Sequence, residues 1–259
     1  MAYYRAKGHF PATLDGRAYR LVAEDRKFWC KVAAGQWERD TFRFLDRCLR
    51  DDSVYLDIGA WIGPTVLFAA ARCRMVYCVE PDPIAYQRLL ANLRMNGVAN
   101  VRSFHGALAA RGGAVRIASE GGFGRSVTRV EVRAPSGVRG DHATVLAMDL
   151  RALLDLWGIA RIDVLKIDIE GAEFDLMPSL MELTTRIKPH IHLSLHAPFF
   201  PRSERRDKLA AVVALAERYA HCYDQRLAEI QPHEILDARL RFEEKPRSVV
   251  LTDEVLSKP

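Results

Sequence analysis

Residues 54–65 read VYLDIGAWIGPT: a short apolar run, then two glycines, then a proline. The run VYLDI predicts a buried strand, because it is too short for a helix of ordinary length. Gly59 and Gly63 permit a tight turn and the close approach of a ligand to bare backbone. Pro64 suits the first turn of a helix, whose free N–H groups can bind an anion. The stretch therefore predicts a strand, a ligand-accessible loop and a helix.

Strand and helix patterns alternate along the rest of the chain. Apolar periodicity predicts strands at 54–58, 75–80, 101–105, 162–168 and 191–195, and helices at 37–50, 65–72, 83–96, 149–157 and 203–219. This alternation is typical of a doubly wound α/β fold, in which helices cover both faces of a mostly parallel sheet. Ligands of such sheets bind beyond the carboxyl ends of the strands, so we expect functional residues directly after each strand.

Two segments depart from the alternation. Residues 1–36 read as turns and short strands around Asp15-Gly16, and we treat them as an N-terminal extension to a domain spanning 37–259. Residues 106–140 are rich in glycine, and Ala114–Ala118 and Val127–Arg133 could pair as a hairpin. We interpret this second segment as an excursion from the sheet rather than a separate domain.

Composition excludes several classes of protein. The chain has 259 residues, of which 49% are hydrophobic, so it can bury a full core and is not intrinsically disordered. No run reaches the roughly 18 apolar residues of a membrane helix, and the start lacks the apolar stretch of a signal peptide, so we expect a cytoplasmic protein. The 5 cysteines are scattered and form no C-x-x-C pair, so neither a disulfide framework nor a zinc site is predicted.

The net charge of +5 raises the question of a nucleic-acid partner. The densest basic stretch, Arg202–Lys208, is interrupted by Glu204 and Asp207, as on the solvated face of a helix. Nucleic acid is therefore not expected as a partner. The sequence gives no indication of the oligomeric state.

An acidic residue ends each of the first two strands. Glu80, after the second strand, could accept hydrogen bonds from two ribose hydroxyls. Alternatively, its charge could stabilise the N-terminus of the helix that Pro83 opens. The dinucleotide pattern G-x-G-x-x-G is not met, because the glycines after Asp57 are spaced G-x-x-x-G, and this counts against NAD.

The fourth strand and its continuation read DVLKIDIEGAE, residues 163–173. With a period of two, Lys166, Asp168 and Glu170 share one face, where burial requires either a ligand or a ladder of ion pairs. His196 follows the fifth strand and has three possible roles: a general base, a metal ligand together with Asp168 or Glu170, or a buried structural histidine. Since its unperturbed pKa is the nearest to neutrality, we take it as the first candidate base, with Asp168 second.

These features resemble the class I S-adenosylmethionine-dependent methyltransferases, and more narrowly the FkbM family. The matching segments are VYLDIGAWIG, VYCVEPDP, FHGAL, LSLHAPF and, most specifically, KIDIEGAE with MDL some 17 residues upstream. GQWERDTF before the first strand also fits the family. The resemblance implies a Rossmann-like sheet of seven strands whose last strand is antiparallel, with Ser248–Leu251 as one of the two late strands.

The resemblance also implies roles for individual residues. Asp168 and Glu170 match the acidic motif beside the transferred methyl group, so that His196, Asp168 and Glu170 are the predicted catalytic residues. The implied residues around the cofactor, S-adenosylmethionine, are Glu38, Asp57, Gly59, Ala60, Gly63, Glu80, Pro81, Gly106, Ala107, Leu108 and Asp168. Trp61 stands where the family often has Asn, so a polar contact is missing there.

We therefore expect a methyltransferase that acts on a hydroxyl of a small molecule such as a sugar or a polyketide. Two alternatives stay open: a protein or RNA methyltransferase, and a non-catalytic S-adenosylmethionine-binding protein. A divalent metal on Asp168, Glu170 and His196 would lower the pKa of the hydroxyl directly, but no metal is expected.

Overall fold

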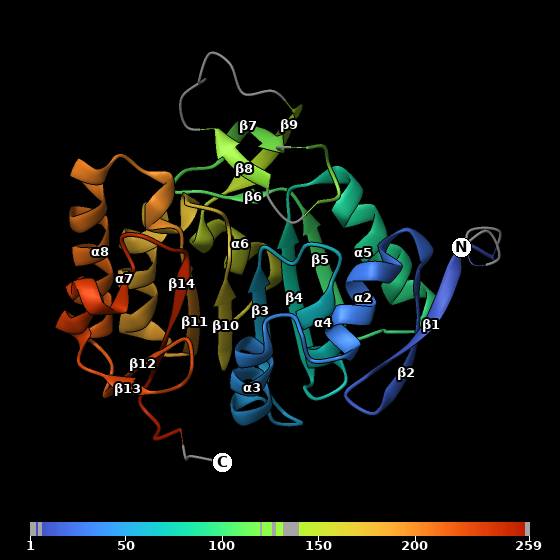
Figure 1. Cartoon of the computed structure of the whole chain (residues 1–259), viewed down its shortest axis with the longest axis horizontal. Helices are drawn as coiled ribbons and strands as arrows, with labels where there is room; N and C mark the ends of the chain where they lie inside the picture. Colours follow the sequence, from blue (N-terminus) through green and yellow to red (C-terminus); the bar gives the residue numbers. More distant parts are fainter. Residues whose placement is uncertain (1–3, 5–6, 120, 126–127, 132–139, 257–259) are drawn as a thin grey trace.

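The computed structural model describes residues 4, 7–119, 121–125, 128–131 and 140–256. Its centre is an eight-stranded sheet in the order β13-β12-β14-β11-β10-β3-β4-β5 (Figure 1). The strands are β3 (Val54–Ile58), β4 (Met75–Glu80), β5 (Val101–His105), β10 (Val164–Ile167), β11 (His190–Leu195), β12 (His221–Asp224), β13 (Glu229–Ile230) and β14 (Arg247–Thr252).

The strands from β5 to β11 are parallel, and β14 is antiparallel to both of its neighbours. This confirms the mostly parallel sheet and the antiparallel late strand. The predicted count of seven strands is wrong, because β13 adds an eighth at the edge. A two-residue strand is held by its pairing with β12 and shows no hydrophobic period in the sequence.

Helices cover both faces of the sheet, which confirms the doubly wound arrangement (Figure 1). Leu56 and Ile58 of β3 pack into one hydrophobic cluster, whereas Tyr55 between them packs into the other. The first cluster includes α6 (Leu150–Trp157), α7 (Met177–Arg186) and α8 (Arg202–Ala216), and the second includes α3 (Arg39–Cys48), α4 (Pro64–Ala70) and α5 (Pro83–Met95). Among the described residues, no helix is long and apolar enough to cross a membrane.

The N-terminal extension packs onto the second cluster. β1 (His9–Leu14) and β2 (Arg17–Val22) form the predicted antiparallel hairpin around Asp15-Gly16. The expectation of turns and strands alone is wrong, since α2 (Arg26–Ala33) follows. Only Trp29 of this helix is buried, so its apolar pattern is weak, and packing against the domain supports the helix instead.

Two asparagines, one in α5 and one at its C-terminal cap, attach the hairpin to the domain. The buried Asn92 accepts a hydrogen bond from the Val22 N–H (2.9 Å) and donates one to the Ile62 carbonyl (3.0 Å). Asn96 exchanges two hydrogen bonds with the main chain of Arg20, at 2.8 and 2.7 Å. The extension is thus linked through α5 to the glycine loop after β3.

We expect Asn92→Ala to lower the free energy of unfolding by about 2–3 kcal/mol, because it leaves a partly buried donor and a buried acceptor without this partner. Urea denaturation measures the change. Gln36→Ala, which removes an exposed amide, serves as the control and is expected to change stability by less than about 0.5 kcal/mol. Equal midpoints for the two variants would contradict the role given to Asn92.

The glycine-rich excursion forms a second sheet at the carboxyl end of the central one (Figure 1). Its order is β6-β9-β7-β8. The predicted hairpin is confirmed in the pairing of β7 with β8, although residues 127 and 132–133 lie outside the described part. The strands are β6 (Ala107–Leu108), β7 (Gly113–Ser119), β8 (Thr128–Glu131) and β9 (Asp141–Met148).

Candidate active site

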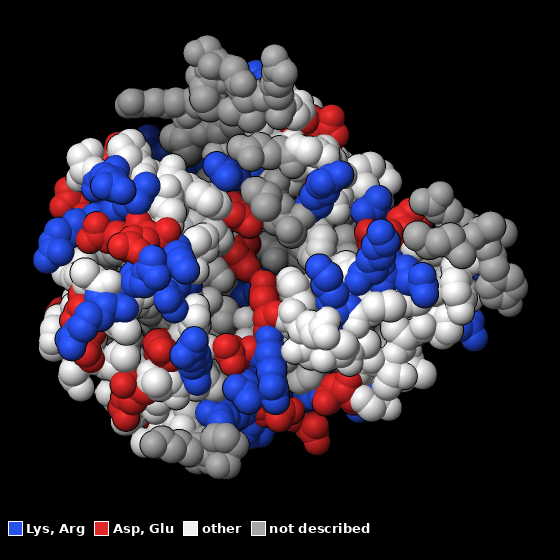
Figure 2. All heavy atoms as spheres, in the orientation of Figure 1, with Lys and Arg blue, Asp and Glu red and all other residues white. Residues whose placement is uncertain are grey.

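A cavity of about 300 Å³ opens where the parallel strands of the central sheet end. Figure 2 shows this face, with acidic residues gathered in a hollow between basic groups. The volume lies at the lower end of the range of small-molecule sites. The predicted residues that line the cavity are Glu38, Gly59, Ala60, Glu80, Pro81, Ala107, Leu108, Asp168, Glu170 and His196. Residues that the sequence predicts to bind a ligand are therefore brought together from successive strand ends, as the parallel topology requires.

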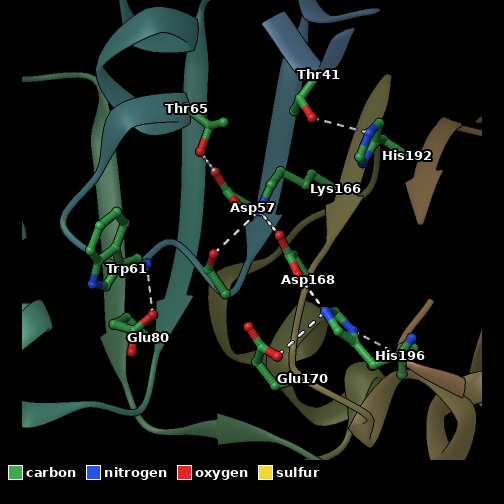
Figure 3. Close-up of polar contacts among 12 residues, drawn as sticks. Thr41, Asp57, Trp61, Thr65, Glu80, Lys166, Asp168, Glu170, His192 and His196 are labelled. Atoms are coloured by element: carbon green, nitrogen blue, oxygen red, sulfur yellow. Dashed lines mark hydrogen bonds and ion pairs between the residues drawn. The ribbon is translucent and has the colours of Figure 1, made fainter. Parts of the chain in front are cut away.

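Asp57 does not line the cavity but lies beneath it, fully buried. One carboxylate oxygen accepts hydrogen bonds from the hydroxyls of Tyr55 (3.0 Å) and Thr65 (2.5 Å). The other lies 3.3 Å from Nζ of Lys166 (Figure 3). The structure thus places Asp57 among groups that support the floor of the site.

Gly63 and Gly106 also lie outside the lining. Packing explains why glycine is needed at both positions and at Gly59: a Cβ on Gly106 would collide with the main-chain oxygen of Leu146. A Cβ on Gly59 (φ +88°) would collide with the main-chain oxygen of Asp168. At Gly63 (φ +92°) a Cβ would lie 2.5 Å from the Leu89 side chain. The bare backbone therefore lets the loop pass close to neighbouring elements as well as to a ligand.

The carboxylate of Glu80 is anchored at the end of β4. It accepts hydrogen bonds from the main-chain N–H groups of Trp61 (2.7 Å) and Asp82 (2.8 Å), one on each oxygen. Burial raises its pKa to about 8. Each oxygen keeps a lone pair for a further donor. The alternative role at the N-terminus of α5 belongs to Asp82, whose side chain caps that helix.

Asp82 also holds the glycine-rich excursion next to the cavity through hydrogen bonds. Its second carboxylate oxygen accepts hydrogen bonds from the Gly124 N–H (2.7 Å) and the Thr128 hydroxyl (2.9 Å). The indole N–H of Trp61 donates to the Gly124 carbonyl at 3.2 Å. Trp61 thus contacts the excursion at the position where the family often has Asn.

Lys166 is a buried cation in the middle of the site. It lies opposite Asp57 on the adjacent strand, and its Nζ lies 3.3 Å from the Gly59 carbonyl and 3.8 Å from Asp168. Burial by itself lowers its pKa, but Asp57, Asp168 and Glu38 outweigh burial and hold the pKa above its usual value. Of the two explanations given for the charged face of this strand, ion pairing accounts for Lys166. Asp168 and Glu170 lie beyond the end of the strand and line the cavity.

His196 meets the two acids on the other side of the cavity (Figure 3). Its Nε2 lies 3.4 Å from Glu170 and 3.7 Å from Asp168. Nδ1 lies 3.2 Å from Glu173, which also accepts the main-chain N–H of His196 at 2.6 Å. Glu170 reaches this position from a left-handed backbone conformation (φ +53°). The three predicted catalytic residues are thus neighbours.

The electrostatic environment shifts three ionisable groups of the cavity. Burial lowers the pKa of His196, but the hydrogen bond and charge of Glu173 and the charges of both acids raise it overall, to about 9. Burial, followed by the charge of Asp168, raises the pKa of Glu170 to about 7. Glu38 is exposed as a residue, yet desolvation of its carboxyl group and the charge of Asp168 raise its pKa to about 7.

Several cavity residues were not predicted from the sequence. Trp37 and Trp61 line one side, and Gln225 and Arg247 belong to the late strands or their loops. Arg247 of β14 pairs with Leu195 of β11, the residue that precedes His196 in the chain. No local pattern marks Arg247, since its position depends on strand pairing across more than 50 residues of chain.

The strand order, the antiparallel β14 and the cavity at the strand ends define a class I methyltransferase with a Rossmann-like fold. The family model of the methyltransferase FkbM domain matches residues 57–223, which is more than half of the chain. The chain belongs to the FkbM methyltransferase family.

Individual known proteins are more distant. The chain is similar to an uncharacterized protein of Methanocaldococcus jannaschii, with 31% identity over 62 residues, or 24% of each chain. It is similar in structure to methyltransferase FkbM from Methylobacillus flagellatus (15% identity, TM-score 0.49, 78% of this chain and 44% of that one). It is also similar to M. jannaschii TYW2 in complex with AdoMet (14% identity, TM-score 0.45, 94% and 84%). The chain thus spans less than half the length of the FkbM structure and matches only a quarter of the curated relative.

Proposed function

We propose that this methyltransferase uses S-adenosylmethionine to methylate a hydroxyl group of a small molecule. The observation that carries the proposal is that Glu80 and Asp168, from strands on either side of β3, line the same cavity. Had these acids lain on opposite sides of the molecule, no single adenosyl donor could contact both.

The chain's own residues fit this cofactor. Glu80 can accept hydrogen bonds from the two ribose hydroxyls, because each of its oxygens has one main-chain donor and room for another. Pro81, Ala107 and Leu108 offer an apolar wall of the kind that an adenine ring contacts. S-adenosylmethionine, when bound, supplies an electrophilic methyl group. The acidic residues at the centre of the cavity favour its positive charges.

The acceptor is proposed to lie beside Asp168, Glu170 and His196. A hydroxyl is a poor nucleophile until its proton is removed, and these three residues line the cavity with groups that can accept a proton. Holding the acceptor oxygen in line with the methyl group supplies a large part of the rate enhancement. The cavity volume of about 300 Å³ supports a small acceptor, and Gln225, Arg247 and Ser248 give its outer wall a polar character.

Calorimetry tests the cofactor claim directly. Wild-type protein is titrated with S-adenosylmethionine and with S-adenosylhomocysteine, and we expect saturable binding of both. Methyl transfer is then measured against a panel of hydroxylated sugars and polyketides. No binding of either nucleoside at millimolar concentration would remove the proposal. If the protein methylates an RNA or a protein and none of the small molecules, the proposed small-molecule acceptor is wrong.

Binding of S-adenosylhomocysteine is expected to strengthen as the pH rises toward 8. Burial raises the pKa of Glu80 to about 8, so this residue is protonated at lower pH, whereas ribose hydroxyls bind better to the carboxylate. Between pH 8 and pH 6, affinity should fall by up to about tenfold per pH unit. Calorimetry at several pH values measures this slope. The Glu80→Gln variant provides the control, and an equal slope in both proteins would assign the dependence to another group.

A further inference from the structure

The three side chains at the acceptor end of the cavity have the spacing of ligands around one ion. One nitrogen or oxygen atom from each of Asp168, Glu170 and His196 lies within 4.8 Å of the other two. Neighbouring ligands of an octahedral cation with bonds of 2.0–2.6 Å lie roughly 2.8–3.7 Å apart. The distances from Nε2 of His196 to the two carboxylates, 3.4 and 3.7 Å, fall within that range.

The orientation of His196 is a second observation. The residue is only 6% exposed, and Nδ1 faces Glu173, which is fully buried. Nε2 is therefore directed at the space between Asp168 and Glu170 (Figure 3). Within the described part of the chain, Nε2 makes no hydrogen bond. A metal-binding histidine typically donates its other ring N–H to a carboxylate in this way.

A proton on Nε2 is the competing explanation, and without an ion the raised pKa of His196 favours it. The distances, however, are not those of hydrogen bonds from such a proton. Charge-assisted hydrogen bonds between an imidazolium and a carboxylate are about 2.7–2.9 Å long. The two distances from Nε2 are longer, and the oxygens of Glu170 and Asp168 approach it from two sides. The gap is wide enough for a cation between the three groups. The fourth acid, Glu173, lies on the Nδ1 side of the imidazole, where its oxygens accept the main-chain N–H groups of Gly171 and His196.

We propose that Asp168, Glu170 and His196 bind a divalent cation, with Glu173 as the residue that positions the imidazole. Two carboxylates favour a hard ion and the imidazole a borderline one, and Mn²⁺ satisfies both preferences, with Mg²⁺ as its competitor. The sequence led us to expect no metal, whereas this geometry favours one. The role of the ion rests on the proposed function: contact with the acceptor oxygen would lower the pKa of the hydroxyl and fix its position. The binding of the ion does not depend on that function.

Electron paramagnetic resonance of Mn²⁺ tests the site without cofactor or acceptor. Free Mn²⁺ gives a sharp signal at room temperature that broadens on binding. The protein is stripped with a chelator and titrated with MnCl₂. We expect one bound ion per chain, displaced by excess MgCl₂. His196→Gln and Glu170→Gln should each weaken binding at least about 100-fold, and Glu173→Gln about 10- to 100-fold.

Glu182→Gln is the matched control, because Glu182 is an exposed acid on α7, and it should bind Mn²⁺ like wild type. Thermal unfolding in the absence of ligand verifies that His196→Gln and Glu170→Gln remain folded. No stoichiometric Mn²⁺ in the wild type, or equal binding in the His196→Gln variant, would overturn the metal site. If S-adenosylhomocysteine fails to bind while Mn²⁺ binds, the proposed function falls and the metal site stands.

Discussion

Replacing Lys166 by Met is expected to lower the free energy of unfolding by about 3–5 kcal/mol. Lys166 is 3% exposed and faces the fully buried Asp57 across two adjacent parallel strands. Removal of the ammonium group leaves the Asp57 carboxylate inside the sheet with only two hydroxyl donors. It also removes a cation that lies 3.8 Å from Asp168. The cost therefore arises from uncompensated negative charge rather than from the loss of one contact.

Chemical denaturation at neutral pH measures this effect, and a second ion pair provides the comparison. Lys188 lies 2.6 Å from Asp253, but both side chains are about 40% exposed, so Lys188→Met should cost less than about 1 kcal/mol. Adding Asp57→Asn to Lys166→Met should recover part of the lost stability, since it removes the orphaned charge. If Lys166→Met unfolds at the same denaturant concentration as Lys188→Met, Lys166 is not needed to stabilise the buried carboxylates.

Glu80→Ala is expected to weaken the binding of S-adenosylhomocysteine at least about 100-fold. Two charge-assisted hydrogen bonds to ribose hydroxyls contribute about 1.5–3 kcal/mol each, which corresponds to a factor of 100 or more in the dissociation constant. The loss is enlarged because the main-chain N–H groups of Trp61 and Asp82 lose their acceptor, so the loop that lines the cavity is no longer fixed.

Two further variants separate binding from folding. Glu80→Gln keeps the size of the side chain and one acceptor, and its affinity should lie between those of the wild type and Glu80→Ala. Glu217→Ala removes an exposed acid at the end of α8 and should bind like the wild type. Thermal unfolding in the absence of ligand reports on the fold. If Glu80→Ala is folded and binds S-adenosylhomocysteine as tightly as the wild type, Glu80 does not bind the ribose.

The fold could be predicted largely from local patterns. Each predicted parallel strand corresponds to an observed one, because a short apolar run between glycine or proline signals can be buried on both faces only inside such a sheet. The helix α7 and the strand β12 were not predicted, and α2 was read as turns. Their local signals are weak, and contacts with distant segments stabilise them.

The candidate site was predictable in its position and less so in its chemistry. Topology alone places residues after parallel strands at one edge, so Glu80, Asp168 and His196 were expected to converge, and they line one cavity. Their functional roles stay predictions. The reason for a glycine at position 59 was only partly visible, since the main chain of Asp168 lies against it in the folded protein.

The sequence by itself determined which residues alternate, where chain reversals occur and which acids follow the strands, because these properties depend on neighbours a few residues apart. Only the tertiary structure decided which charges are neutralised and which remain open to a ligand. Lys166, Asp168 and Glu170 form one alternating series in the sequence, yet the first pairs with Asp57 in the sheet and the other two face His196. That division depends on strand register and on the left-handed backbone of Glu170, and neither is encoded in a local pattern.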